Sequence, residues 1–210
     1  MKDLFNLDHP LWRMMGLLTD FMLLTIVWFV FSLPLITIGP SSIAFFHVGV
    51  KLNQKTGRGV IREFTETFIN KFKSSFWIGI LVLLLATVIG ANLWYYHTAE
   101  GSLSTFLLFV FLFLSICLIS LFLYFFPYLA IFNGPVKEIV MFAFYSSVKH
   151  FKWTLFMFVI NATILFVTFY PAPYLVFFTI GGISYLNTKV ILMLIEDYNY
   201  TSIRSLHLKN

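Results

Sequence analysis

The chain has 210 residues, of which 60% are hydrophobic, 20% are aromatic and only 11% are charged, and its mean hydropathy is +0.89. Soluble domains carry about 25% charged residues, so a soluble fold of this length could not bury so much apolar surface. The composition therefore excludes a soluble globular protein and predicts an all-α integral membrane protein. The net charge of +5 does not indicate nucleic-acid binding, because Lys and Arg of membrane proteins concentrate in cytoplasmic loops.

The first third of the chain predicts one crossing flanked by two surface helices. Residues 1–20 predict a helix that lies on the membrane, because apolar side chains recur along one face. Residues 21–38 carry no charge and predict the first crossing, kinked near its end by Pro34. Residues 43–52 are too short to cross. Residues 51–73 are rich in Lys and Arg and predict an amphipathic helix on the inner face.

The rest of the chain predicts four more crossings, which makes five in total. They are expected at about 76–94, at 103–126, at 153–170 and from 174 to about 195. Residues 136–151 predict another amphipathic helix, and residues 171–173 predict a tight turn, since two of the three are proline.

Basic residues set the expected orientation. The segments that follow the first and third crossings, and the C-terminal tail, contain Lys or Arg, whereas those that follow the second and fourth contain none. Since positive loops stay inside, this pattern predicts an external N-terminus and a cytoplasmic C-terminus. Lys2 and Arg13 oppose that orientation, which also places Asp20 near the outer face.

The order of elements repeats within a single membrane domain that covers residues 1–210. Units of about 21–95 and 103–170 each contain a crossing, a proline, a Gly-Pro pair, an amphipathic stretch, a Phe-Lys pair and a second crossing. Both units would face the same way, as in transporters with parallel repeats. The residues expected to turn each helix onto the inner membrane surface are Pro34, Gly39, Pro40, Pro127, Gly134 and Pro135.

Several charged and polar residues are candidate functional residues. Asp20, Asn161 and Lys189 lie within apolar segments or at their edges, where they could serve ion or proton coupling. We favour an interfacial role for Asp20 and for Lys189, and an interhelical hydrogen bond for Asn161. The inner-face basic residues would contact anionic lipid or, alternatively, dock a partner. They are Lys51, Lys55, Arg58, Arg62, Lys71, Lys73, Lys149 and Lys152.

No residue pattern in the sequence predicts catalysis. The chain has no P-loop, no nucleophile elbow and no pair of acids at a catalytic spacing. Cys117 is the only cysteine and sits within an apolar segment, which does not favour a metal ligand or a disulfide. We therefore expect no enzymatic activity, no metal and no cofactor.

The run from Trp28 to Pro40 contains Ser-Leu-Pro-x-x-Thr-Ile-Gly-Pro. This run resembles the hallmark of the YesL-like family, as does the segment from Phe64 to Lys73. The resemblance implies a multi-pass protein of the bacterial cytoplasmic membrane, whose biochemical function is unknown. Genes of that family commonly lie beside those for carbohydrate ABC transporters and glycoside hydrolases.

Two functions follow as hypotheses. The first is an accessory protein for carbohydrate uptake, with the lipid bilayer and subunits of a sugar ABC transporter as partners. The alternative is a small transporter or channel that moves a sugar or an ion itself, as a homo-oligomer or alone.

Overall fold

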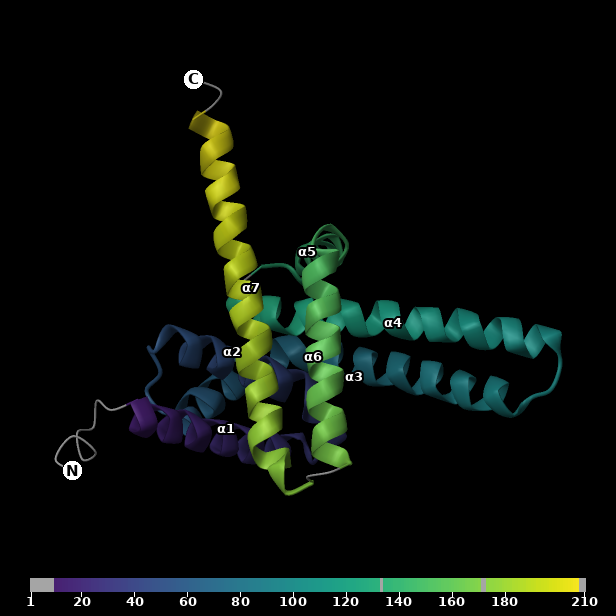
Figure 1. Cartoon of the computed structure of the whole chain (residues 1–210), viewed down its shortest axis with the longest axis horizontal. Coiled ribbons are helices and arrows are strands. Elements are labelled where there is room, and N and C mark those ends of the chain that lie inside the picture. The colour runs from purple at the N-terminus through teal and green to yellow at the C-terminus, as the bar shows by residue number, and fades with distance from the viewer. Residues whose placement is uncertain (1–9, 133, 171–172, 208–210) are drawn as a thin grey trace.

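The computed structural model describes residues 10–132, 134–170 and 173–207, and every regular element within them is helical. The prediction of an all-α fold is confirmed for these residues (Figure 1). The helices are α1 (Pro10–Ser32), α2 (Ile38–Gln54), α3 (Val60–Thr98), α4 (Ser102–Ile131), α5 (Val136–Lys149), α6 (Phe151–Phe169) and α7 (Val176–His207). Short 3₁₀ turns, η2 (Leu35–Thr37) and η3 (Pro173–Leu175), precede α2 and α7.

Six helices are long and apolar enough to cross a membrane, one more than the sequence predicts. These candidate spans are Met14–Ser32, Leu35–Gln54, Val60–Thr98, Ser102–Ile131, Phe151–Phe169 and Val176–Glu196. A multi-pass membrane protein is therefore supported, but the count of five crossings is not confirmed. The additional span is α2, which includes the segment predicted to be too short.

The surface helix predicted at the N-terminus is not a separate element for the residues that can be compared. Positions 1–9 lie outside the described residues, and positions 10–20 run without a break into the apolar part of α1. The helix ends at Ser32, before the expected kink, because the residue that precedes Pro34 is disfavoured in helical conformation. The corner is completed by η2, where the Thr37 hydroxyl donates to the Phe31 carbonyl (2.5 Å).

Helix α2 lies at the centre of the fold. One hydrophobic core contains Ala44, Phe45 and Val48 of α2, packed with residues of α1 and α3. A second core contains Ile43 of α2 together with residues of α4, α5, α6 and α7. Since α2 belongs to both cores, its position determines how the two halves of the chain pack.

Close backbone contact holds α2 against α3. Gly39, expected to be part of the corner, instead lies in the first turn of α2, as does Pro40. A Cβ built on Gly39 would lie 2.7 Å from the Gly79 Cα and 2.5 Å from the Ser75 carbonyl oxygen. Only glycine at both positions allows the two helices to approach this closely.

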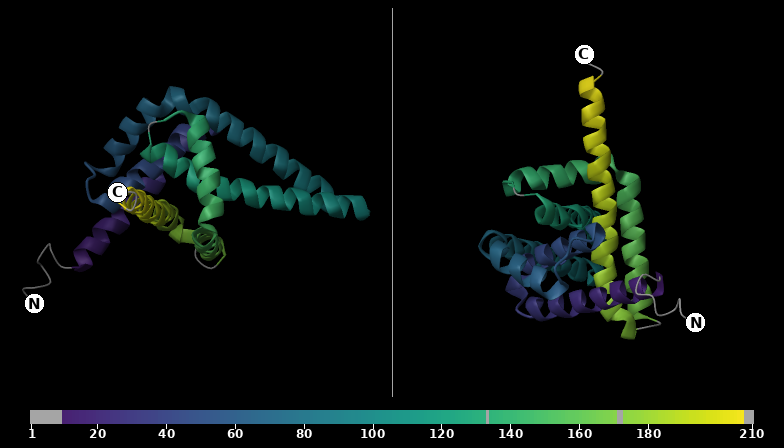
Figure 2. Two further views of the ribbon diagram at one scale, coloured as in Figure 1. Left: turned by 90° about the horizontal axis from the view of Figure 1, so that it is seen from above. Right: turned by 90° about the vertical axis from the view of Figure 1, so that its left-hand side faces the viewer.

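The expected surface helix at 51–73 and the second crossing are not separate elements. Lys51 is in the last turn of α2, and everything from Val60 onward belongs to the single helix α3. Its 39 residues would extend roughly 58 Å, about twice the hydrocarbon thickness of a bilayer. The ribbon of α3 bends along its length (Figure 2).

The second half of the chain follows the predicted order, with one correction. Helix α4 continues through Pro127 and ends only at Ile131. The helix survives the proline because its last turns are buried, with Tyr124 and Tyr128 at most 1% exposed. Their hydroxyls pair with Thr154 (2.9 Å) and Ser146 (3.1 Å). The bend falls instead in the segment of Gly134 and Pro135, which precedes α5.

The predicted internal repeat is not confirmed. Helix α2 separates α1 from α3 in the first unit, whereas residues 132–135 alone connect α4 to α5 in the second. The amphipathic stretch is the start of α3 in the first unit and the separate helix α5 in the second.

Two helical hairpins extend from the packed body in different directions. The outer parts of α3 and α4 run side by side away from it, and the α6–α7 pair runs across them (Figure 1, Figure 2). Placing both pairs along one membrane normal would require a rotation of one pair relative to the other. The membrane topology is therefore argued from the order of the spans along the chain and from the charge of the segments that connect them.

Candidate functional site

A cavity of about 660 Å³ lies between α1, α2, the following loop, α3 and α7. We call it the charged cavity, because its polar lining residues are Asp20, Lys51, Lys55, Glu63 and Tyr185. Its remaining side chains are mostly apolar. A volume in this range suits a small ligand or a lipid head group.

The loop between α2 and α3 places the two lysines. Lys55 ends α2 in a left-handed conformation with a φ of 55°, and its N–H donates to the Leu52 carbonyl (3.3 Å). The N–H of Thr56 donates to the Lys51 carbonyl (3.2 Å). Gly59, whose φ is 110°, then directs the chain into α3. The tight ending of α2 therefore brings Lys51 and Lys55 to the same cavity.

Glu63 joins three segments beneath this cavity. Its side chain is 12% exposed, and its Oε1 accepts a hydrogen bond from the backbone N–H of Arg58 (3.2 Å). Its Oε2 lies 3.8 Å from His47 Nε2. The other ring nitrogen of His47 lies 3.4 Å from the Ala130 carbonyl oxygen. The Glu63 carboxylate is therefore already engaged by neighbouring groups.

Helix α7 closes the cavity through polar contacts with α2. Asn53 Nδ2 lies 2.9 Å from both the Tyr185 carbonyl oxygen and Thr188 Oγ1. The Ser184 hydroxyl donates to the Phe45 carbonyl (2.8 Å). Sequence reasoning missed that Glu63 lines the cavity and that His47 and Asn53 contact its lining residues Glu63 and Tyr185. Polar residues within an apolar helix were the available signal, but their partners are distant in the sequence.

Several predicted site residues come together here and others do not. Asp20 was expected near the outer face, away from the basic segment, yet it lines the same cavity as Lys51 and Lys55. Arg58 contributes its backbone at the edge, while its side chain is exposed. Arg62 is also exposed and pairs with Glu66 on the next turn (2.8 Å). Lys73, Lys149 and Lys152 are exposed and lie outside the cavity.

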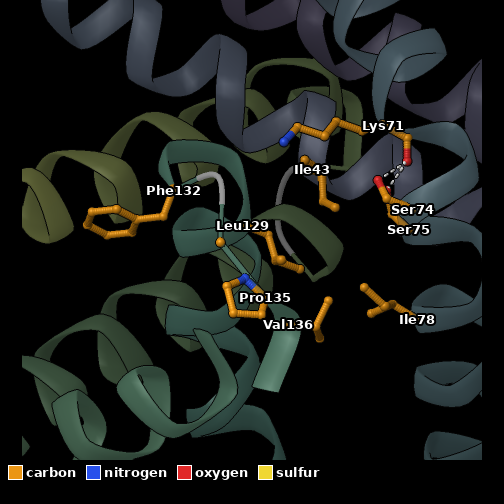
Figure 3. A pocket seen from close by; sticks show the side chains of 10 residues that line it. Ile43, Lys71, Ser74, Ser75, Ile78, Leu129, Phe132, Pro135 and Val136 are labelled. Atoms are coloured by element: carbon orange, nitrogen blue, oxygen red, sulfur yellow. Dashed lines mark hydrogen bonds between the residues drawn. The ribbon is translucent and has the colours of Figure 1, made fainter. Parts of the chain in front are cut away.

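A second cavity, of about 440 Å³, contains the bend before α5 (Figure 3). Gly134, Pro135 and Val136 line one side, and Lys71, Ser74 and Ser75 of α3 line another. Both serine hydroxyls donate to the Lys71 carbonyl, so their donors are used within the helix. Pro34, Gly39 and Pro40 are not among its lining residues, so the two predicted corners do not form one site.

The α6–α7 interface confirms one predicted contact. Asn161 Nδ2 donates to Asn187 Oδ1 (3.1 Å), as expected for an interhelical hydrogen bond. The Asn161 Oδ1 atom is buried without a hydrogen-bond partner. Lys189 is exposed and lines a smaller groove of about 240 Å³ together with Trp153 and Asn187.

The described residues include no group of three or more His, Cys, Asp or Glu side chains that could hold a metal ion. The carboxylates, lysines and tyrosine of the charged cavity can bind a ligand by charge and hydrogen bonding.

Residues 21–93 match a family described as "Protein of unknown function, DUF624". The matched segment is about a third of the chain and comprises most of α1, η2, α2 and most of α3. It is consistent with the resemblance to the YesL-like family and assigns no activity. None of the curated proteins and none of the solved structures matches the chain significantly.

Proposed function

We propose that this chain is a multi-pass accessory protein of the bacterial cytoplasmic membrane, which binds subunits of a carbohydrate ABC transporter through its α3–α4 hairpin. The observation that carries the proposal is the projection of this hairpin from the packed body (Figure 1). The resemblance to the YesL-like family supports a partner from carbohydrate uptake.

Most of the side chains on the outer hairpin are exposed. Trp94, Phe106 and Phe113 are each more than 60% exposed. The two helices contact each other through the stacked rings of Tyr96 and Phe111, whose centroids are 5.6 Å apart. Lipid could cover such a surface, so its apolar character alone does not indicate a protein partner.

A face of small residues on α3 favours another helix over lipid. Ala86, Thr87, Gly90 and Ala91 are exposed, and Ala86 and Gly90 have the small-xxx-small spacing of helix contacts within membranes. A Cβ on Gly90 would have no neighbour within 4 Å, so this face points away from α4 and the body. A partner helix could approach it closely.

Gly90→Leu is expected to lower recovery of the transporter subunits about tenfold when the tagged chain is purified from gently solubilised native membranes. The reason is steric: the Cβ of leucine would meet no atom within 4 Å, and the rest of its side chain would occupy the face that a partner helix needs. Ala162→Leu, an equally exposed small-to-large change on α6, serves as the control and should leave recovery unchanged. Unchanged recovery with Gly90→Leu, or an equal loss with Ala162→Leu, would count against the proposed interface.

The charged cavity favours the second candidate function, a small transporter, because residues of both signs of charge line it. That function predicts that purified protein in liposomes takes up a labelled sugar or ion, and that Asp20→Asn slows uptake. Lys73→Gln, which lies outside the cavity, should have no effect. Liposomes without flux above a protein-free control would leave the accessory role as the better proposal.

The orientation is proposed with both termini in the cytoplasm, in place of the external N-terminus expected from five crossings. With six spans, every connecting segment on one side contains Lys or Arg, and the segments 33–37, 99–101 and 170–175 on the other side contain none.

A further inference from the structure

The charged cavity holds charges of both signs that are not paired with each other. Asp20 comes from α1, Lys51 from α2 and Lys55 from the following loop. Among the ion pairs within the described part of the chain, none involves any of these three side chains. Glu63 differs, since the backbone N–H of Arg58 donates to one of its oxygens and His47 Nε2 lies 3.8 Å from the other.

The walls of the charged cavity combine these charges with apolar side chains. Met14, Leu17, Val48, Leu52 and Val60 form the apolar part of the wall. Asp20 and Lys51 are half-buried beside this wall and Lys55 is exposed, so the three groups keep part of their hydration and remain accessible to a ligand. Because Asp20 and the two lysines are fixed on different elements, a ligand that carries both signs of charge can pair with all of them at once.

With α1 and α2 as membrane spans, the cavity would lie near the level where lipid head groups meet their acyl chains. Asp20 is six residues inside the start of the Met14–Ser32 span, which places it roughly 9 Å along the helix. Lys51 lies in the last turn of α2, at the end of the next span. The polar part of a lipid could enter the cavity while its chains remain in the hydrocarbon.

We propose that the charged cavity binds a phosphoethanolamine group, with its phosphate at Lys51 and Lys55 and its ammonium group at Asp20. A phosphate has several acceptor oxygens and can pair with two ammonium groups simultaneously. Asp20 is the lining carboxylate that remains available for the ligand's ammonium group. This inference goes beyond the accessory function and does not depend on the α3–α4 hairpin.

Native mass spectrometry of the purified protein, equilibrated with equal amounts of phosphatidylethanolamine and phosphatidylglycerol, tests the proposal. The wild-type protein should retain phosphatidylethanolamine preferentially. Asp20→Asn should lower its retention about tenfold and remove the preference, because the ammonium group loses its partner. The double variant Lys51→Gln/Lys55→Gln should lower retention of both lipids. Lys73→Gln, whose side chain lies outside the cavity, is the control and should match the wild type.

Calorimetry with free phosphoethanolamine distinguishes the two sources of the same group. Heat of binding that disappears in Asp20→Asn would support the proposal with a soluble ligand. Retention of the lipid without binding of free phosphoethanolamine would support it with a membrane lipid. Equal retention of the two lipids by the wild type, or retention of phosphatidylethanolamine that is unchanged in both cavity variants, would overturn it. The substituted side chains make no hydrogen bond or ion pair with the described residues, so these variants should fold.

Discussion

Gly39→Leu is expected to prevent α2 from packing on α3 and therefore to abolish the folded protein. Even the Cβ of alanine at this position would lie 2.5 Å from the Ser75 carbonyl oxygen and 2.7 Å from the Gly79 Cα. These are backbone atoms, so no side-chain rotation can relieve the contact. The two helices would have to separate, and α2 would then lose its place in both hydrophobic cores.

The size of the effect should rise with the size of the side chain. Overpacking commonly costs about 1–3 kcal/mol and can cost more where the neighbours cannot move. Gly39→Ala should therefore lower the melting temperature of the detergent-extracted protein, and Gly39→Leu should yield no monodisperse peak in size-exclusion chromatography.

Gly90→Ala provides the matched control, since it lies in α3 and its Cβ would meet no atom within 4 Å. It should leave the melting temperature unchanged or slightly raised, because alanine favours the helix over glycine. A Gly39→Leu protein that extracts and melts like the wild type would contradict the close approach of α2 and α3.

The segment that the sequence predicted least well is the one at the centre of the fold. Gly39-Pro40-Ser41-Ser42 has the composition of a loop, and the residues after it looked too short to cross a membrane. In the structure Ser41 is fully buried, donates to the Thr37 carbonyl (2.5 Å) and accepts from the Ser32 hydroxyl (3.0 Å). Small polar residues allow helices to pack closely, but they also lower the mean hydropathy of the segment. The sequence of a central helix can therefore resemble that of a turn.

Helices whose own side chains are apolar on every face were predicted more accurately. The crossing expected at 103–126 lies within α4, and the one expected at 153–170 nearly coincides with α6. The one error in these two helices is the expected bend at Pro127. The helix continues through this proline because tertiary burial around Tyr124 and Tyr128 outweighs the local helix breaker. The charged cavity could not be predicted in the same way. Its residues come from positions 14 to 185, and hydropathy carries no information about which of those positions meet.

Labelling of introduced cysteines should show that both termini of the chain face the cytoplasm. The sequence-based count of five crossings required Lys2 and Arg13 to lie outside, against the charge rule. Six spans remove that conflict, because the N-terminal segment then lies on the inner side of the membrane, as does the loop that contains Lys55 and Arg58. The charged cavity supports this arrangement, because Asp20 in the first half of α1 and Lys51 at the end of α2 line the same space. Helices α1 and α2 thus run as an antiparallel pair, which five crossings did not allow.

The test uses Cys117→Ala as the background, a change at an exposed position of α4. In intact cells a membrane-impermeant maleimide should label Leu33→Cys and Glu100→Cys fully, because both lie in segments without Lys or Arg on the proposed outer side. It should label Lys2→Cys and Arg58→Cys only after the cells are permeabilised. The labelling of Lys2→Cys and Leu33→Cys distinguishes the two topologies. If Lys2→Cys is labelled in intact cells and Leu33→Cys is not, then α2 does not cross the membrane, and the arrangement of five crossings with an external N-terminus is restored.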